Sequence, residues 1–424
     1  MSGARPGSSG AHRLAAVTAW EPERPAERLT PWLSMARGNS NSYLVEGDDG
    51  DVVIDVGTAY QGERNRERFE QLLGRPLAVR AIVLMQGHAD HFGGWQAFAD
   101  AGVRVHASAR LTSLWAERTA LRDYFIPRTA AIIGRKIGWE DPRRHAAYWD
   151  PPVPVVTDPV DGAGAFELGE RRFELFAAPG GESLDGIVVW MPVERVAFSG
   201  NLLGAMFTQF PHLATIRGDR QRSAVTYIED VERLLALAPR MLVTSHEEPI
   251  AGEERVREEL TRLRDAVVHL RDYTIAGMAA GRGMWELMAG AVLPPELELR
   301  YSRGPLSWYV RAIWEELTGW YRAESVSELF ATPAAAIYPR LAELVGGPAV
   351  IAAAAAEAAA AGRPEEALHL TDVALAVAPA DPDVLRARRE AVAALLARGG
   401  GRDYDETAVL ESELAAIEDR LGGA

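Results

Sequence analysis

The chain has 424 residues, of which 48% are hydrophobic, which is enough for a sizeable core and for two domains. Asp and Glu (60) outnumber Lys and Arg (45), and the net charge of −15 argues against a nucleic-acid partner, because an acidic surface repels phosphate. Cysteine is absent, which excludes disulfides, thiolate ligands and cysteine nucleophiles, so any metal must be bound by His, carboxylate or amide groups.

The start of the chain and the length of its apolar runs predict where in the cell the protein is found. Residues 1–25 are rich in Gly, Ser, Ala, Pro and Arg and predict a flexible tail without an export signal. No run approaches the roughly 18 apolar residues of a membrane helix. We therefore expect a cytoplasmic protein with no membrane partner.

From residue 42 onward, segments typical of strands alternate with segments typical of helices. Residues 42–46 and 52–55 predict two strands joined by a tight turn. Further strands are expected at 78–85, 103–107, 172–177, 186–191, 195–199 and 241–245, with helices at 63–73 and 95–101. This alternation predicts α/β layers.

Beyond residue 253 the strand pattern stops. Amphipathic spacing predicts helices over 253–278 and 307–321. The segment 364–396 resembles one helix–turn–helix hairpin of the tetratricopeptide kind, with no second clear copy, and a last helix is expected at 404–421. We place a domain boundary near 255, which predicts a flexible tail at 1–25, a catalytic domain at 26–254 and a helical domain at 255–424.

The strongest chemical signal is the segment from Gln86 to Gly94, which contains His88, Asp90 and His91. It follows a buried strand and precedes a helix, so these side chains lie on one short connection at a sheet edge. Neighbouring imidazoles beside a carboxylate indicate a metal site, because a cation can organise all three. The alternative is a polar loop in which Asp90 only caps a helix.

This motif resembles the metallo-β-lactamase superfamily, and His-Ala-Asp-His-Phe-Gly-Gly resembles its alkylsulfatase branch. Other segments similar to that branch are Pro179-Gly180-Gly181-Glu182, Ser199-Gly200-Asn201, Thr215-Ile216-Arg217-Gly218, Ser245-His246 with Pro249, Leu317-Thr318-Gly319-Trp320 and the hairpin at 348–397. The resemblance covers about residues 30–400. It implies a metallo-β-lactamase αββα sandwich followed by an all-α, tetratricopeptide-like domain, and a homodimer formed through that helical domain.

The resemblance also implies two metal positions. The first would use His88 and Glu182, with Gln86 where the family has its first His. The second would use Asp90, His91 and His246. Asn201 would lie between the two metals, where the family has a carboxylate. Asp55, at a strand end, would support the site from outside.

Gln86 and Asn201 depart from the family pattern. Both are neutral amides, which are weaker donors to Zn²⁺ than imidazole or carboxylate. Without a bridging carboxylate, two dications a few ångströms apart repel each other more strongly. We therefore expect one or two zinc ions, with the second position binding more tightly. The first would be empty, weak or occupied by a harder ion such as Mn²⁺ or Fe²⁺.

These assignments imply a metal-dependent hydrolase acting on a small molecule, a sulfate or related ester of an apolar alcohol. Asp90, Glu182 and Arg217 are the expected catalytic residues, with Glu182 or Asp185 as a base when not bound to metal. Arg217 would bind the anionic group of the substrate, although a surface arginine is the alternative. His212 is a further candidate for substrate binding.

Two other functions stay open. The amides favour lyase, isomerase or redox chemistry at a single metal on the same scaffold. A non-catalytic binding protein is the third option, against which five converging ligands argue. The acidic balance makes a nuclease the weakest reading.

Overall fold

The computed structural model describes residues 21–134, 138–300 and 302–422, so most of the expected tail at 1–25 lies outside the described residues. The chain forms two compact units, one ending at Glu316 and the other beginning at Leu317.

Two β-sheets form the centre of the first unit. The seven-stranded sheet has the order β1 (Glu27–Arg28), β2 (Leu33–Ala36), β3 (Ser42–Gly47), β4 (Gly50–Ile54), β5 (Val79–Leu84), β6 (Arg104–Ser108) and β7 (Asp158–Val160). The six-stranded sheet has the order β13 (Ile250–Ala251), β12 (Met241–Thr244), β11 (Val196–Gly200), β10 (Ile187–Met191), β9 (Arg171–Ala177) and β8 (Ala163–Leu168). Strands β4 to β7 run parallel, as do β11 and β12. Every strand expected from the sequence is present, whereas β1, β2, β7, β8 and β13 were not predicted.

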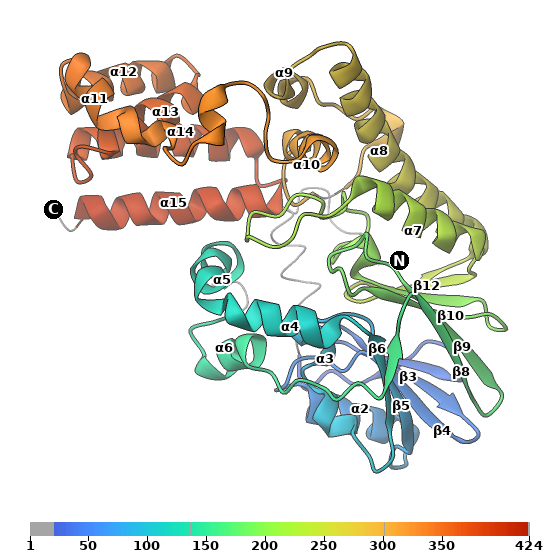
Figure 1. Ribbon diagram of the computed structural model, residues 1–424. Helices are drawn as coiled ribbons and strands as arrows, with labels where there is room; N and C mark the ends of the chain where they lie inside the picture. Colours follow the sequence, from blue (N-terminus) through green and yellow to red (C-terminus); the bar gives the residue numbers. More distant parts are fainter. Residues whose placement is uncertain (1–20, 135–137, 301, 423–424) are drawn as a thin grey trace. The chain divides into compact units, whose positions relative to one another are not determined.

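Side chains along single strands alternate between two cores, as the period of two along a strand requires. On β5, Val83 packs into the core between the sheets, whereas Ile82 packs under the helices of the first sheet. On β10, Val189 packs between the sheets, whereas Val188 and Trp190 face the helices of the second. The expected αββα sandwich is confirmed (Figure 1).

Helices cover both outer faces. On the side of the first sheet are α2 (Gly62–Leu73), α3 (Ala89–Phe92), η1 (Trp95–Phe98), α4 (Leu111–Ala120), α5 (Arg122–Thr129), the π-helical η2 (Ala130–Gly134) and α6 (Pro142–Trp149). On the other side are η3 (Asn201–Leu203), α7 (Ala224–Ala236), α8 (Glu253–Ala279), α9 (Met284–Ala289), η4 (Pro295–Leu297) and α10 (Leu306–Thr318). The helix expected at 95–101 is only a short 3₁₀ turn, because the backbone leaves helical geometry at Ala99, where ψ is 66°.

The first unit continues well past residue 255. Leu260, Leu263 and Leu270 of α8 are fully buried in the core on the outer face of the second sheet, and Tyr309 and Val310 of α10 join the same core. The boundary expected near 255 marks the end of the strands, whereas the compact unit extends to Glu316 because these apolar faces complete its core.

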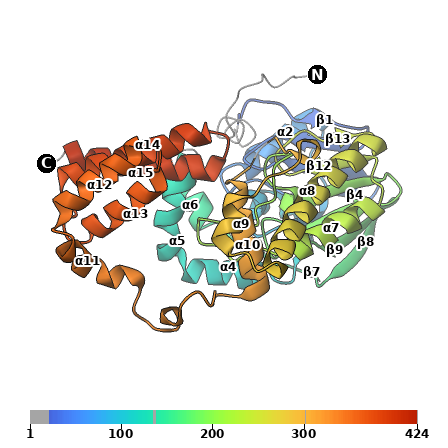
Figure 2. The same cartoon turned by 90° about the horizontal axis from the view of Figure 1, so that it is seen from above.

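The second unit is helical within the described residues. Its elements are η5 (Val326–Leu329), η6 (Ala334–Ile337), α11 (Tyr338–Leu344), α12 (Pro348–Ala360), α13 (Pro364–Leu375), α14 (Pro382–Gly399) and α15 (Tyr404–Gly422) (Figure 2). The expected hairpin is α13 and α14, and Asp381 caps α14 by accepting from the backbone amides of Asp383 and Val384. Buried alanines such as Ala355, Ala367 and Ala391 allow α12, α13 and α14 to approach closely.

In the described part of the chain, no single helix has the length and apolar character to cross a membrane. The helices Ala334–Leu344 and Pro348–Ala360 are long and apolar enough when taken together, but a bend of 103° separates them.

Candidate metal centre

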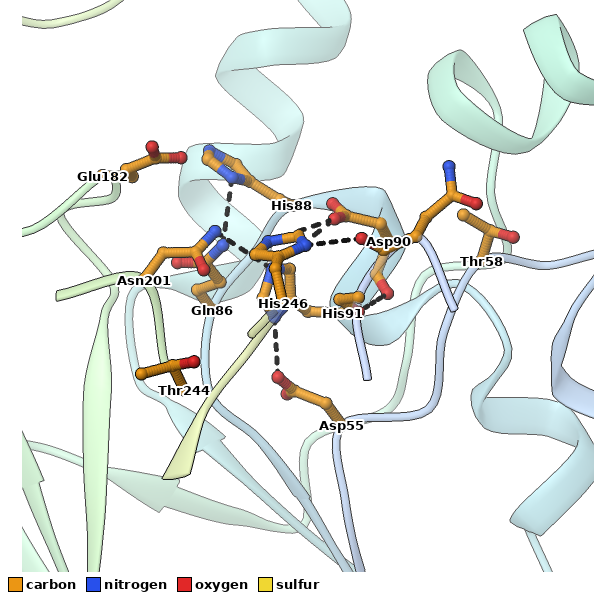
Figure 3. Close-up of polar contacts among 12 residues, drawn as sticks. Asp55, Thr58, Gln86, His88, Asp90, His91, Glu182, Asn201, Thr244 and His246 are labelled. Atoms are coloured by element: carbon orange, nitrogen blue, oxygen red, sulfur yellow. Dashed lines mark hydrogen bonds and ion pairs between the residues drawn. The ribbon is translucent and has the colours of Figure 1, made fainter. Parts of the chain in front are cut away.

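The side chains of the centre come from strand ends of both sheets. Asp55 follows β4, and the ligand loop with His91 follows β5, its parallel neighbour. Asn201 follows β11, and His246 follows β12, again a parallel pair. Because parallel strands end at the same edge of a sheet, the two pairs bring four distant segments together at one edge of the sandwich (Figure 3).

Asp90, His91 and His246 form a compact triad. Each offers one ligand atom, and these atoms lie within 4.8 Å of one another. Oδ2 of Asp90 is 3.7 Å from Nε2 of His91 and 3.9 Å from Nε2 of His246. Among the described residues, this is the one group of three or more His and carboxylate side chains with such spacing. The loop and the strand end expected to share a metal do meet.

Hydrogen bonds orient both imidazoles of the triad. Nδ1 of His91 donates to Oδ2 of Asp55 at 2.6 Å, and Nδ1 of His246 donates to the backbone oxygen of Asn39. Asp55 is itself held, because its Oδ1 accepts from the amide of Met85 at 2.8 Å. These bonds leave both Nε2 atoms facing Asp90, the arrangement typical of imidazole ligands supported from behind. The Asn39 carbonyl was not predicted, because any residue supplies a backbone oxygen.

Burial and the neighbouring charges shift the pKa values of the three triad residues in different directions. Burial alone would lower the pKa of His91, but the carboxylates of Asp55 and Asp90 outweigh it and raise that pKa to about 9. Burial lowers the pKa of His246. Burial also favours the neutral form of Asp90, but the neighbouring imidazoles hold the pKa of this carboxyl below its usual value. Asp90 is therefore an anion at neutral pH.

The donor set fits a metal ion. One carboxylate and two imidazoles converge, which are groups that Zn²⁺ accepts in a tetrahedral site. Nδ2 of Asn201 lies 3.3 Å from Nε2 of His91, while its buried Oδ1 has no hydrogen-bond donor among the described residues. A buried acceptor without a donor is costly, and a cation can compensate it.

Asp55→Asn is expected to weaken metal binding by about 10- to 100-fold. An amide can offer its single oxygen either to His91 or to the amide of Met85, so one of the two bonds is lost in either orientation. Competition with a chromophoric chelator measures the affinity. Asp51→Asn is the control, since Asp51 is equally buried at the opposite end of β4, where it pairs with Arg75. An equal loss in both variants would contradict a specific role for Asp55.

The residues expected at the first metal position contact other side chains of the protein. Nε2 of Gln86 contacts Nδ1 of His88 at 3.0 Å, so these two side chains bond to each other. Glu182 is 4% exposed, and its Oε1 accepts from Nη2 of Arg303 at 2.9 Å. Although burial opposes it, the charges of Arg303, His88 and Arg217 hold the pKa of Glu182 well below its usual range. Sequence reasoning missed Arg303, which lies in no motif and is 121 positions from Glu182.

The loop that carries Glu182 is packed tightly on both sides. A Cβ on Gly180 would lie 2.5 Å from Cα of Tyr227, and one on Gly181 would lie 2.5 Å from Cα of Leu202. Asp230 of α7 accepts from the amide of Gly180 at 2.8 Å. The glycines of this motif therefore let the loop lie directly between α7 and η3.

Asp230→Asn is expected to be stabilised relative to the natural chain as pH rises from 4 to 7. Burial raises the pKa of Asp230 to about 6, against about 4 in an unfolded chain. Between these values the folded state keeps a proton that the unfolded state has lost, so the free energy of unfolding falls as pH rises. Asparagine also accepts a hydrogen bond from Gly180 but does not titrate. The free energy of unfolding that the natural chain loses by neutral pH, up to about 3 kcal/mol, is therefore not lost in the variant.

Thermal unfolding at pH 4.5 and 7.5 checks this expectation, with Glu232→Gln, an exposed site on the same helix, as the control. A difference between Asp230→Asn and the natural chain that does not change with pH would contradict it.

A cavity of about 80 Å³ opens beside His88 and Glu182. Residues of α4 and α5 supply an apolar wall that includes Trp115 and Phe125, and Asp219 and Arg222 supply charge. The cavity therefore has both an apolar and a charged wall.

Of the remaining predicted residues, Asp185 lines this cavity, whereas His212 and Arg217 lie near Glu182. His212 is buried, with Nδ1 3.9 Å from Oε1 of Glu182, and burial together with the nearby arginines holds its pKa well below the usual value. Arg217 lies close enough for its charge to lower the pKa values of Glu182 and Asp219. Asp185 is buried, and burial raises its pKa.

Comparison with known families matches both parts of the chain. Residues 35–246 match the metallo-beta-lactamase superfamily, and residues 284–405 match the alkyl sulfatase dimerisation family. The resemblances expected from the motifs are confirmed.

Similar proteins agree with these matches. A linear primary-alkylsulfatase of a Pseudomonas species is 27% identical over 361 residues, which cover 79% of this chain and 66% of that protein. An alkyl/aryl-sulfatase of Saccharomyces cerevisiae is 23% identical over 73% of this chain and 50% of its own length. The solved structure of the stereoselective inverting sec-alkylsulfatase Pisa1 from Pseudomonas superposes with a TM-score of 0.77 at 22% identity, covering 94% of this chain and 66% of that one, which shows a shared fold. The chain thus spans between half and two thirds of the length of these relatives.

Proposed function

The chain belongs to the metallo-β-lactamase superfamily, and on this premise we propose that it is a metal-dependent hydrolase of a sulfate or related ester of an apolar alcohol. The observation that carries the proposal is the convergence of Asp90, His91 and His246 within 4.8 Å. The names of the relatives support the substrate class, since those of Pseudomonas and yeast are alkylsulfatases.

The residues suggest how such an ester would be held and cleaved. Asp90, His91 and His246 would hold one ion, with Asn201 as a further oxygen donor, and zinc suits this set although Mn²⁺ and Fe²⁺ stay open. A bound ion would lower the pKa of water and polarise an ester oxygen. Arg217 would bind the anionic group through two parallel hydrogen bonds.

Proton transfer needs a base of suitable strength. The ion pair with Arg303 keeps the pKa of Glu182 low and makes it a weak base. Burial raises the pKa of Asp185, so this carboxylate is better matched to the task. We propose Asp185 as the base, with His212 beside Glu182 contributing to substrate binding.

An apolar group would need its own place. A second cavity, of about 330 Å³, is lined by Leu213, Ile216 and Trp308 and shares Asp219 with the first. The segment that lines it also carries Arg217, and we propose that an alkyl chain held here would present its sulfate to that guanidinium.

Release of sulfate from a series of linear alkyl sulfates tests the function. We expect the rate of sulfate release to rise with the length of the alkyl group. Release should stop when a chelator removes the metal and return when Zn²⁺ is added. Ion chromatography of free sulfate is the measurement. If metal-loaded protein releases sulfate from none of these alkyl sulfates, the proposed hydrolase function is wrong.

The amides at Gln86 and Asn201 favour a second candidate, a lyase, isomerase or redox step at a single metal. Protein loaded with Co²⁺ discriminates the two. A visible spectrum that changes with a small molecule, without any ester hydrolysis, would favour this candidate.

We also propose that the chain forms a homodimer through its helical part. The match of residues 284–405 to a dimerisation family supports it. Sedimentation equilibrium is expected to give twice the mass of one chain, and a single-chain mass at micromolar concentration would contradict the dimer.

A further inference from the structure

We infer that Arg303 takes the place of a second cation opposite Glu182, so that the centre binds one metal ion, at Asp90, His91 and His246. This inference rests on the metal-dependent function proposed above and adds a reason for its stoichiometry. It assigns Glu182 to an ion pair within the protein.

The contact between Arg303 and Glu182 is short and shielded from water. Nη2 of Arg303 lies 2.9 Å from Oε1 of Glu182, and the two side chains are 6% and 4% exposed. A carboxylate buried this deeply requires a compensating positive charge. A guanidinium meets that requirement with a charge-assisted hydrogen bond, so Glu182 needs no metal to be tolerated.

The charges around Glu182 oppose an additional dication. Arg222 is 3% exposed and donates to the backbone oxygen of Glu182, and it lies 3.0 Å from Oδ2 of Asp219. Together with Arg217 and Arg303, three guanidinium groups stand against the two carboxylates of Glu182 and Asp219. Three guanidinium groups this close to Glu182 offset the attraction that its carboxylate would exert on a second metal ion.

The other two residues of the first position are engaged with each other. Nε2 of Gln86 and Nδ1 of His88 lie 3.0 Å apart, which is a hydrogen bond between two groups that would have to face a common ion. All three side chains of this position therefore have partners within the protein. Side chains engaged in this way do not fit a second metal ion.

Metal stoichiometry of the whole chain tests the inference. After loading with Zn²⁺ and dialysis, elemental analysis is expected to find one ion per natural chain. Titration calorimetry is expected to show a second binding event in Arg303→Met, tightened at least tenfold in Arg303→Met combined with Gln86→His. Gln86→His alone should stay at one ion.

Two controls separate charge from fold. Arg311→Met removes an arginine that is paired with Glu315 on the exposed side of α10, and it should keep one ion. Arg303→Lys keeps the positive charge and should also keep one. Glu182→Gln, which tests the role of Glu182 without touching Arg303, should retain one ion at unchanged affinity if Glu182 is not a ligand.

Each outcome decides between defined alternatives. Two ions of similar affinity in the natural chain would overturn this inference and leave the hydrolase proposal standing. Loss of the bound ion in Glu182→Gln, or no second event in folded Arg303→Met combined with Gln86→His, would also overturn it. No ion at all in the natural chain would overturn the proposed function, and this inference with it.

Discussion

His91→Ala is expected to lower kcat/KM for alkyl sulfate hydrolysis by about a thousandfold or more and to leave the chain without a tightly bound metal ion. His91 is the most constrained member of the triad, because Nδ1 is fixed by Asp55 at 2.6 Å and Nε2 lies 3.7 Å from Asp90. Its removal takes away one of three ligands and leaves the carboxylate of Asp55 buried without this partner.

Parallel measurements of sulfate release and bound metal test this result. His269→Ala is the matched control, because it removes an imidazole from α8 that contacts the backbone oxygen of Val292, and it should change neither quantity. Full metal content in folded His91→Ala would show that the ion is bound elsewhere and would contradict the proposed centre.

Gly94→Ala is expected to destabilise the first unit by about 3 kcal/mol and to reduce metal binding at the same time. A Cβ at this position would lie 2.5 Å from the backbone oxygen of Val56 and 2.8 Å from Cα of Gly62. Both contacts are with backbone, so the chain itself must move. Val56 follows Asp55, and Gly94 lies on the loop of His91. The amide of Val56 donates to the backbone oxygen of His91 at 2.9 Å, so a shift at Gly94 would disturb both residues.

Gly283→Ala gives the comparison, since a Cβ there meets nothing within 4 Å and its φ of −77° suits any residue. Thermal unfolding and chelator competition measure stability and metal affinity for both variants. If Gly94→Ala matches Gly283→Ala in both, close approach of the backbones does not position the ligand loop.

The sequence was sufficient to predict a strand or loop where the residues of that segment alone show the pattern. The strands β3, β4 and β5 were predictable because their alternating or continuous apolar residues reflect burial on one or both faces. The ligand loop was predictable because its ligands are neighbours in sequence. The short strands β1 and β13, of two residues each, carry no such period and form only because a neighbouring edge offers hydrogen bonds.

By itself, the order of residues determined the α/β layers, the helical end of the chain and the set of groups able to hold a metal; the αββα arrangement was implied by the family resemblance. The family resemblance predicted that His246 would join Asp90 and His91, whereas only the folded chain showed that Arg303 lies against Glu182. The physical reason is that hydrophobic period and ligand type are local properties of a sequence. A charge, by contrast, is balanced by whatever lies within a few ångströms, and for Glu182 that partner is 121 positions away.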